Sequence, residues 1–289
     1  MRLRSKWGRA LMRIAKIFGI LYLGLLLLVF FGQRKLIYHP DKGQGGSRLA
    51  EERGFQAWQN EYGQYIGWKQ LRKMPQSHGQ ILIVHGNSGS AVDRLDYADD
   101  LQKVEPLDVY ILEYPGFGAR DGSPSEKIFF RAADEAINLL KKQGPVYLMG
   151  ESLGTGVAAY LAGTYPEAVQ GVLLVAPYDN MTHVAQYHMP IFPVSLMLLD
   201  RFPSSSYFKN YHGPVAMLFA GRDGVVPNRF GHKLFEDYQG PKRFWEVPQV
   251  GHNDLLSQTD DWWRGLISFW KANPAPDEAA APKKSAATK

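Results

Sequence analysis

Short apolar runs separated by longer amphipathic stretches recur along most of this chain, from about residue 80 onward. The runs have the length and β-branched content of buried strands, and the stretches between them space apolar residues as helices do. Strands that alternate with helices predict an α/β fold, with a mostly parallel sheet covered by helices on both faces. The predicted strands are 81–84, 109–112, 146–149, 172–175, 215–219 and 244–247, and the predicted helices are 93–103, 126–142, 155–164, 228–238 and 260–270.

Three segments depart from this alternation. Residues 58–71 contain two glycines and predict an antiparallel hairpin ahead of the parallel strands. Residues 178–212 are longer than one crossover helix requires, and their apolar, proline-containing sequence predicts a lid insertion that walls a binding pocket. The same side chains could simply cover the sheet. The candidate pocket residues are Met189, Ile191, Phe192 and Leu196. Residues 273–289 lack large apolar side chains and predict a disordered tail.

The amino terminus has a different pattern. Residues 17–32 carry no charge, whereas residues 1–16 contain six cations. Sixteen helical residues span about 24 Å, slightly less than the hydrocarbon core of about 30 Å, and Lys16 and Arg34 can extend the match by snorkelling. We therefore predict an uncleaved transmembrane signal anchor at 17–32. Cleavage and secretion are the alternative, although no small-residue cleavage site follows the apolar run.

The cations also predict an orientation. Six precede the apolar segment and only Arg34 and Lys35 follow it directly, which favours a cytoplasmic location for residues 1–16. In a bacterium the chain is then a single-pass inner-membrane protein, and the domain at 33–272 lies in the periplasm. The absence of cysteine is compatible with that compartment without requiring it.

The net charge of +5 does not indicate a nucleic-acid partner. The first forty residues hold eight Lys or Arg and no acidic residue, which leaves 25 basic against 28 acidic residues in the rest. Because the domain after the apolar segment is mildly acidic, we predict that the chain binds no nucleic acid.

The most chemically specific segment is Gly150-Glu151-Ser152-Leu153-Gly154. It follows a predicted strand and precedes a predicted helix, which is the setting in which a Gly-x-Ser-x-Gly turn presents a nucleophilic serine. Taken alone, such a turn could serve only packing. The serine also needs a base, because its hydroxyl is a weak nucleophile at neutral pH.

Candidate partners follow Ser152 in the chain. Asp223 comes after the strand at 215–219 and His252 after the strand at 244–247, so acid and histidine follow the serine in the order found in α/β-hydrolases. Because the carboxyl ends of parallel strands form one edge, we expect these side chains to meet there. His252 would accept the serine proton and Asp223 would orient the imidazole. The backbone amides of Asn87 and Leu153 are the candidate oxyanion hole.

The motifs together resemble the α/β-hydrolase superfamily, and more narrowly the membrane-anchored serine hydrolases related to acyl-protein depalmitoylases and monoacylglycerol lipases. The resemblance covers roughly residues 33–271. It implies that Ser152, Asp223 and His252 form a catalytic triad that needs no cofactor. One departure is Gly221, which stands where relatives often carry an additional acid. The motifs that carry the resemblance are His85-Gly86-Asn87, 114–118 with 122–125, 150–154, 222–227 and 251–254.

These observations favour a membrane-anchored serine hydrolase that cleaves carboxylic esters or thioesters with an acyl or lipid-like group. A serine peptidase of the same fold and a non-catalytic, membrane-tethered binding protein are the alternatives. His183 and His188 lie in the insertion without carboxylates or cysteines at ligand spacing, so no metal site is predicted. The sequence predicts neither the acyl-chain length nor the oligomeric state.

Overall fold

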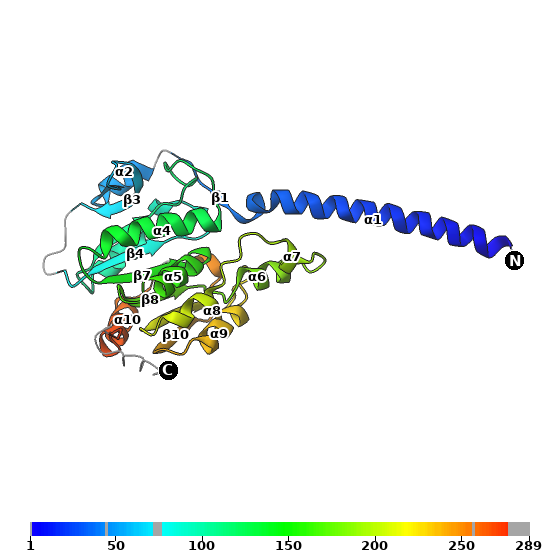
Figure 1. Ribbon diagram of the computed structural model, residues 1–289. Coiled ribbons are helices and arrows are strands. Elements are labelled where there is room, and N and C mark those ends of the chain that lie inside the picture. Colours follow the sequence, from blue (N-terminus) through cyan, green and yellow to red (C-terminus); the bar gives the residue numbers. More distant parts are fainter. Residues whose placement is uncertain (1, 44–45, 72–76, 256–257, 277–289) are drawn as a thin grey trace, which may run out of the picture.

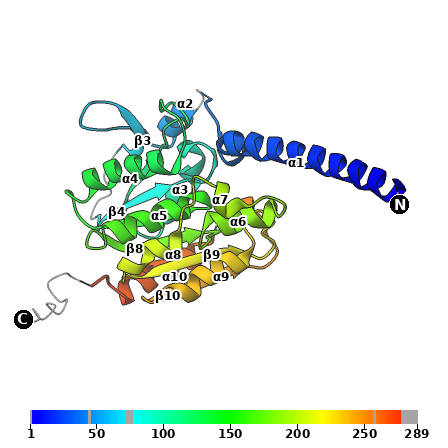
Figure 2. The same cartoon turned by 45° about the vertical axis from the view of Figure 1, so that its right-hand side comes forward.

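The computed structural model describes residues 2–43, 46–71, 77–255 and 258–276. Helix α1 (Arg2–Ile37) projects from the remaining elements as a single rod (Figures 1 and 2). Its 36 residues extend for about 54 Å, so the helix is much longer than the predicted segment at 17–32. Among the described residues, Trp7–Ile37 is the one helical stretch long and apolar enough to cross a membrane.

An eight-stranded sheet forms the centre of the domain, in the order β10-β9-β8-β7-β4-β6-β3-β2. The six strands from β10 to β6 are parallel, and β3 runs antiparallel to both of its neighbours. This arrangement confirms the predicted α/β fold and the predicted hairpin. The strands are β2 (Phe55–Gln59), β3 (Tyr65–Gln70), β4 (Gln80–Val84), β6 (Asp108–Leu112), β7 (Val146–Glu151), β8 (Val169–Val175), β9 (Val215–Ala220) and β10 (Lys242–Val247).

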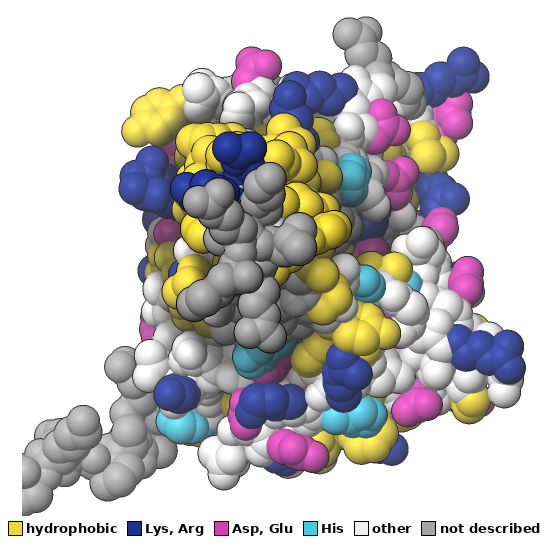
Figure 3. Space-filling view, turned by 90° about the vertical axis from the view of Figure 1, so that its right-hand side faces the viewer, with side chains coloured by type: hydrophobic (Ala, Val, Ile, Leu, Met, Phe, Trp, Pro, Cys, Tyr) yellow, Lys and Arg dark blue, Asp and Glu magenta, His cyan; other side chains and the backbone are white. Residues whose placement is uncertain are grey.

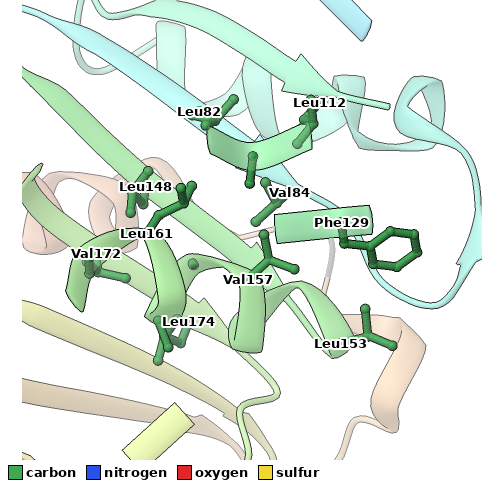
Figure 4. Packing of buried hydrophobic residues seen from close by; sticks show 14 of the residues in the cluster. Leu82, Val84, Leu112, Phe129, Leu148, Leu153, Val157, Leu161, Val172 and Leu174 are labelled. Carbon is green, nitrogen blue, oxygen red and sulfur yellow. The ribbon is translucent and has the colours of Figure 1, made fainter. Parts of the chain in front are cut away.

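Helices cover both faces of this sheet. Along β4, Leu82 and Val84 belong to one buried cluster and Ile81 and Ile83 to the other, because successive side chains of a strand point to opposite faces. Figure 4 shows the first cluster, where Val157 of α5 lies over the sheet. The helices on this face are α4 (Glu126–Leu140), α5 (Leu153–Thr164) and α9 (Asn228–Asp237), and those on the other are α2 (Gly46–Glu52), α3 (Leu95–Gln102) and α10 (Asp260–Ala272).

The insertion between β8 and β9 contains short helices on the side of the domain from which α1 departs (Figures 1 and 2). They are α6 (Met181–His188), α7 (Val194–Met197), α8 (Ser204–Tyr207) and η2 (Phe208–Asn210). A two-stranded pairing of β1 (His39–Pro40) with β5 (Ser88–Gly89) ties the chain after α1 to the loop after β4. The remaining short helices are η1 (Ala91–Arg94) and η3 (His252–Asp254).

Candidate active site

Ser152 occupies a sharp turn between β7 and α5. Its φ of 50° and ψ of −118° lie outside the region that side-chain-bearing residues ordinarily adopt. The flanking glycines make the turn possible. A Cβ on Gly150 would lie 2.5 Å from the carbonyl oxygen of Gly154, and a Cβ on Gly154 would lie 2.3 Å from that of Val84. Strand and helix can therefore approach closely only without side chains at these two positions.

Three side chains that are far apart in the sequence meet beside this turn. His252 Nε2 lies 2.9 Å from Ser152 Oγ, and His252 Nδ1 lies 2.7 Å from Asp223 Oδ2. The three residues follow β7, β9 and β10, whose carboxyl ends lie at one edge of the sheet. The serine hydroxyl, imidazole and carboxylate thus form a continuous hydrogen-bonded series. Such a series can move a proton from the hydroxyl to the imidazole.

The carboxylate is fixed by its own turn. Asp223 Oδ1 accepts hydrogen bonds from the backbone N–H groups of Val225 and Val226, at 2.9 and 2.7 Å. The Asp223 side chain is 1% exposed and the His252 side chain 9% exposed. With Oδ1 held by two amides, Oδ2 is left to face His252. The imidazole therefore has a fixed acceptor at Nδ1, which determines which ring nitrogen faces the serine.

Gly221 has a packing role that the sequence did not reveal. A Cβ at this position would lie 2.3 Å from the carbonyl oxygen of Pro248, because the loops after β9 and β10 approach closely here. Gly221 N–H donates to Val247 O at 2.8 Å, and Arg222 N–H donates to Val250 O at 2.9 Å. These bonds join the loop that carries Asp223 to the loop that carries His252. No side chain fits at residue 221 in this arrangement.

The loop after β4 lies against the serine turn. A Cβ on Gly86 would be 3.5 Å from Ser152 Cβ, so Gly86 borders the Ser152 side chain. Within the described part of the chain, neither Asn87 N–H nor Leu153 N–H donates to another group. Asn87 also donates through Nδ2 to Ile37 O at 2.6 Å. These two amides are therefore free to donate to a bound group, and their role as an oxyanion site stays a prediction.

A buried pair holds this loop in place. His85 is fully buried, and its two ring nitrogens lie 3.0 Å from Gly86 O and 3.1 Å from Glu113 Oε1. The Glu113 carboxylate also accepts from Ala91 N–H at the start of η1. His85 thus connects the end of β4 to the residue that follows β6. Its motif position was evident in the sequence, but its partner Glu113 was not.

A second buried pair supports the serine turn from behind. Arg94 Nε and Nη2 donate to the two carboxylate oxygens of Glu151, each at 2.8 Å, in a bidentate geometry. The side chains are 9% and 17% exposed. Burial lowers the pKa of Arg94, but the Glu151 carboxylate outweighs that effect, and the net pKa is raised. Arg94 therefore remains a cation and stays paired with Glu151, the residue that precedes the candidate nucleophile. No pattern in the sequence indicated this partner.

His183 and His188 of the insertion have structural partners. His183 Nδ1 lies 2.6 Å from Asp179 Oδ2, and His188 Nε2 lies 2.8 Å from Val225 O. Among the described residues, no group of three or more His, Cys, Asp or Glu side chains could hold a metal ion. The contact of His188 joins the end of α6 to the turn that begins at Asp223.

The four candidate pocket residues of the insertion separate into two pairs. Met189 and Phe192 line an apolar cleft between the insertion and the last turns of α1. Ile191 and Leu196 do not line it and are 66% and 82% exposed. The physical reason is their position, because Ile191 lies in the connection between α6 and α7 and Leu196 lies on the outer side of α7. Hydrophobic composition alone could not separate these pairs.

Comparison with known proteins identifies related chains. Residues 79–203 match the family model described as the alpha/beta hydrolase fold. The uncharacterized protein Rv2307c of Mycobacterium tuberculosis is 32% identical over 249 residues, which cover 83% of this chain and 88% of that protein. The lysophosphatidylserine lipase ABHD12 of Danio rerio is 30% identical over 208 residues, which cover 62% of this chain and 52% of the relative.

The fold also matches solved structures. The esterase Pf2001 of Pyrococcus furiosus superposes with a TM-score of 0.61 at 15% identity, and the match covers 81% of this chain and 99% of the esterase. At this level of identity the likeness concerns the fold, because one fold can carry many functions. Function must be argued from the site.

Proposed function

Because the chain belongs to the α/β-hydrolase superfamily, we propose that it is a membrane-anchored serine hydrolase that cleaves carboxylic esters or thioesters. The observation that carries the proposal is the hydrogen-bonded series from Ser152 through His252 to Asp223. Similarity to a lysophosphatidylserine lipase supports an acyl or lipid-like substrate. A non-catalytic protein of this fold would have no physical need to keep both the Ser152–His252–Asp223 hydrogen bonds and the two free backbone donors.

In the proposed first half-reaction, Ser152 Oγ attacks the acyl carbon while its proton passes to His252 Nε2. Asp223 stabilises the imidazolium through Nδ1. The C–O or C–S bond then breaks, and His252 returns the proton to the departing alcohol or thiol. The product that remains is an acyl ester on Ser152.

In the second half-reaction, water attacks the acyl-serine and gives its proton to His252, which passes it to Ser152 Oγ as the carboxylic acid leaves. In both halves, negative charge develops on the former carbonyl oxygen. In this proposal the amides of Asn87 and Leu153 receive that charge, and removal of one such donor costs about 3 kcal/mol of transition-state stabilisation. All steps of the proposed reaction use side chains and backbone groups of this chain and need no cofactor.

The test is covalent labelling of the full chain with a fluorophosphonate probe. Wild type should be labelled and should hydrolyse p-nitrophenyl butyrate, whereas Ser152→Ala should not be labelled and should lose about 10⁶-fold in kcat. Ser268→Ala, which changes an exposed serine of α10, is the matched control and should behave as wild type. A folded wild-type chain that neither reacts with the probe nor cleaves any ester would exclude the proposal and favour the binding-protein alternative.

The peptidase alternative uses the same three residues and is separated by substrate. Rates on p-nitrophenyl esters and acyl thioesters should exceed rates on aminoacyl anilides by a wide margin. Faster cleavage of the anilides would reverse the assignment while leaving the roles of Ser152 and His252 intact.

We also propose that α1 anchors the domain, with residues 1–16 in the cytoplasm and the catalytic domain in the periplasm. The chain contains no cysteine, so a single introduced thiol reports location without interference. In intact bacterial cells, Ser268→Cys should react with a membrane-impermeant maleimide. A thiol that reacts only after the cells are lysed would contradict this topology, and release of the chain into the medium would indicate cleavage.

A further inference from the structure

The last turns of α1 and the insertion enclose an apolar cleft, and none of its lining residues takes part in the reaction steps proposed above. Its empty space is about 420 Å³, part of which opens to the outside. Gln33 is the one polar residue in its lining. The lining residues from α1 are Val29, Phe30, Gln33, Leu36 and Ile37, and those from the insertion are Ala185, Met189, Phe192, Val194, Met197 and Leu198.

Polar contacts fix the two walls relative to each other. Gln33 is buried, accepts from Leu199 N–H at 2.8 Å and donates to Met197 O at 3.2 Å. Arg34 makes a bidentate pair with Asp200, whose carboxylate also accepts from Tyr38 Oη. These contacts span more than 160 residues of sequence. The end of α1 is thus part of the domain, rather than a linker to it.

A further contact lies nearer the N-terminus of α1. Tyr22 Oη donates to Ile191 O at 2.6 Å, so the connection between α6 and α7 is held against the middle of α1. Together with the contacts of Gln33, this bond attaches the insertion to α1 at two separate points.

Both walls of the cleft are hydrogen-bonded to loops that belong to the candidate site. Ile37 lines the cleft, and its carbonyl oxygen accepts from Asn87 Nδ2 at 2.6 Å. Asn87 follows Gly86, the residue that borders Ser152. On the opposite side, His188 at the end of α6 contacts Val225, two residues after Asp223. The α1 wall is therefore attached to the loop that borders Ser152, and the insertion wall to the turn that carries Asp223.

The insertion also exposes hydrophobic side chains that do not line the cleft. Figure 3 views the domain from the side of α1 and shows hydrophobic side chains gathered around the helix. Ile191, Leu196 and Leu199 of the insertion are 66%, 82% and 51% exposed. Exposed apolar side chains beside a helix that can span a membrane mark a surface that contacts lipid.

We propose that this cleft is the acyl-chain site of the enzyme, and that the membrane helix α1 supplies one of its walls. The inference rests on the proposed hydrolase function and extends it. An unbranched acyl chain fits the observations because the lining offers almost no polar partner, and because both walls are bonded to the loops beside Ser152 and Asp223. The chain would enter from the bilayer along α1, with its carbonyl carbon reaching the serine last.

The experiment fills the cleft from the α1 side and uses the neighbouring residue as control. Val29→Trp places a large side chain in the cleft, whereas Leu28→Trp places the same side chain on the 70% exposed, outward face of the same helix turn. Full-length variants in lipid nanodiscs are assayed on p-nitrophenyl acetate and palmitate. Val29→Trp should lower the ratio of palmitate to acetate kcat/KM by about tenfold or more, and Leu28→Trp should leave it unchanged.

A second variant tests the other wall. Ala185→Phe enters the cleft from α6 and should lower the same ratio. If wild type cleaves acetate but neither filling variant changes the ratio, the acyl-site proposal fails while the hydrolase function stands. If wild type cleaves no ester and does not react with a fluorophosphonate, the hydrolase function itself fails.

A binding measurement tests the proposed acyl-chain site in a variant that does not hydrolyse the substrate. A photoreactive palmitate analogue should cross-link Ser152→Ala at α1 and α6, and Val29→Trp in that background should abolish the cross-link. Cross-linking elsewhere would overturn the assignment. Palmitoyl glycerol and a palmitoyl-cysteinyl peptide then separate a lipid source of the chain from a protein source.

Discussion

Replacement of Arg94 by Met should destabilise the domain more than any comparable change at an exposed arginine. The guanidinium makes two 2.8 Å hydrogen bonds to Glu151, and both side chains are largely removed from water. Without it, the carboxylate stays buried and loses its counter-charge. Such losses cost about 3–5 kcal/mol, and because Glu151 is 17% exposed we take the lower value, about 3 kcal/mol.

For a domain of this size, 1 kcal/mol corresponds to a shift in Tm of about 2–4 °C, so Arg94→Met should lower Tm by about 6–12 °C. Thermal unfolding of the full chain in detergent, followed by circular dichroism, measures the shift. Arg48→Met is the matched control, because the Arg48–Glu52 pair is exposed and contributes at most about 1 kcal/mol.

A double variant identifies the cause. Arg94→Met with Glu151→Leu removes both charges, and paired replacement of a buried ion pair by apolar side chains is often close to neutral. The double variant should therefore recover more than half of the lost Tm. The reasoning is refuted if Arg94→Met unfolds no earlier than Arg48→Met, or if the double variant is no more stable than the single one.

Three further outcomes are expected. Asp223→Asn should keep the fold but lower kcat on p-nitrophenyl butyrate by about 10⁴-fold, because the amide leaves the imidazole in the wrong tautomer; a loss below tenfold would contradict that role. Gly154→Ala should lower Tm because its Cβ would lie 2.3 Å from Val84 O, whereas Gly265→Ala, in open space on α10, should raise stability by about 0.5–1 kcal/mol. Burial raises the pKa of Glu126 above its usual 4.5, so the stability associated with its neutral form is present below pH 4.5 and lost as pH rises through the folded pKa. Glu126→Gln should flatten that part of the Tm profile against pH, and an unchanged slope would exclude Glu126 as its source.

The sheet could be predicted from sequence because its determinants are local. Each parallel strand is a short run of large apolar residues, as in 81–84 and 215–219, and each run ends in a turn. The candidate site could be predicted for the same reason. Its serine, acid and histidine each follow a strand, and parallel strands bring their carboxyl ends to one edge whatever the loops between them do.

The supporting contacts could not be predicted, because they join residues with no local pattern. Arg94 lies 57 positions from Glu151, and nothing around either residue indicates the other. A charged residue in an amphipathic helix is normally a solvated one. Similarly, hydrophobicity identified the insertion as apolar, but only the chain path determines that Met189 faces α1 and Leu196 does not.

The end of α1 shows that the limit of an apolar segment can be read from the sequence while its contacts with the rest of the fold cannot. In the sequence, Gln33 and Arg34 mark the point where the apolar segment stops, which is how a membrane helix normally ends. In the fold, the same two residues bind the insertion, and the helix continues to Ile37 beside the loop at Asn87. The last turns of α1 are therefore also a wall of the cleft. A shortened chain beginning after α1 would keep Ser152 and its partners but lose that wall, so its activity on short esters would misrepresent the specificity of the intact protein.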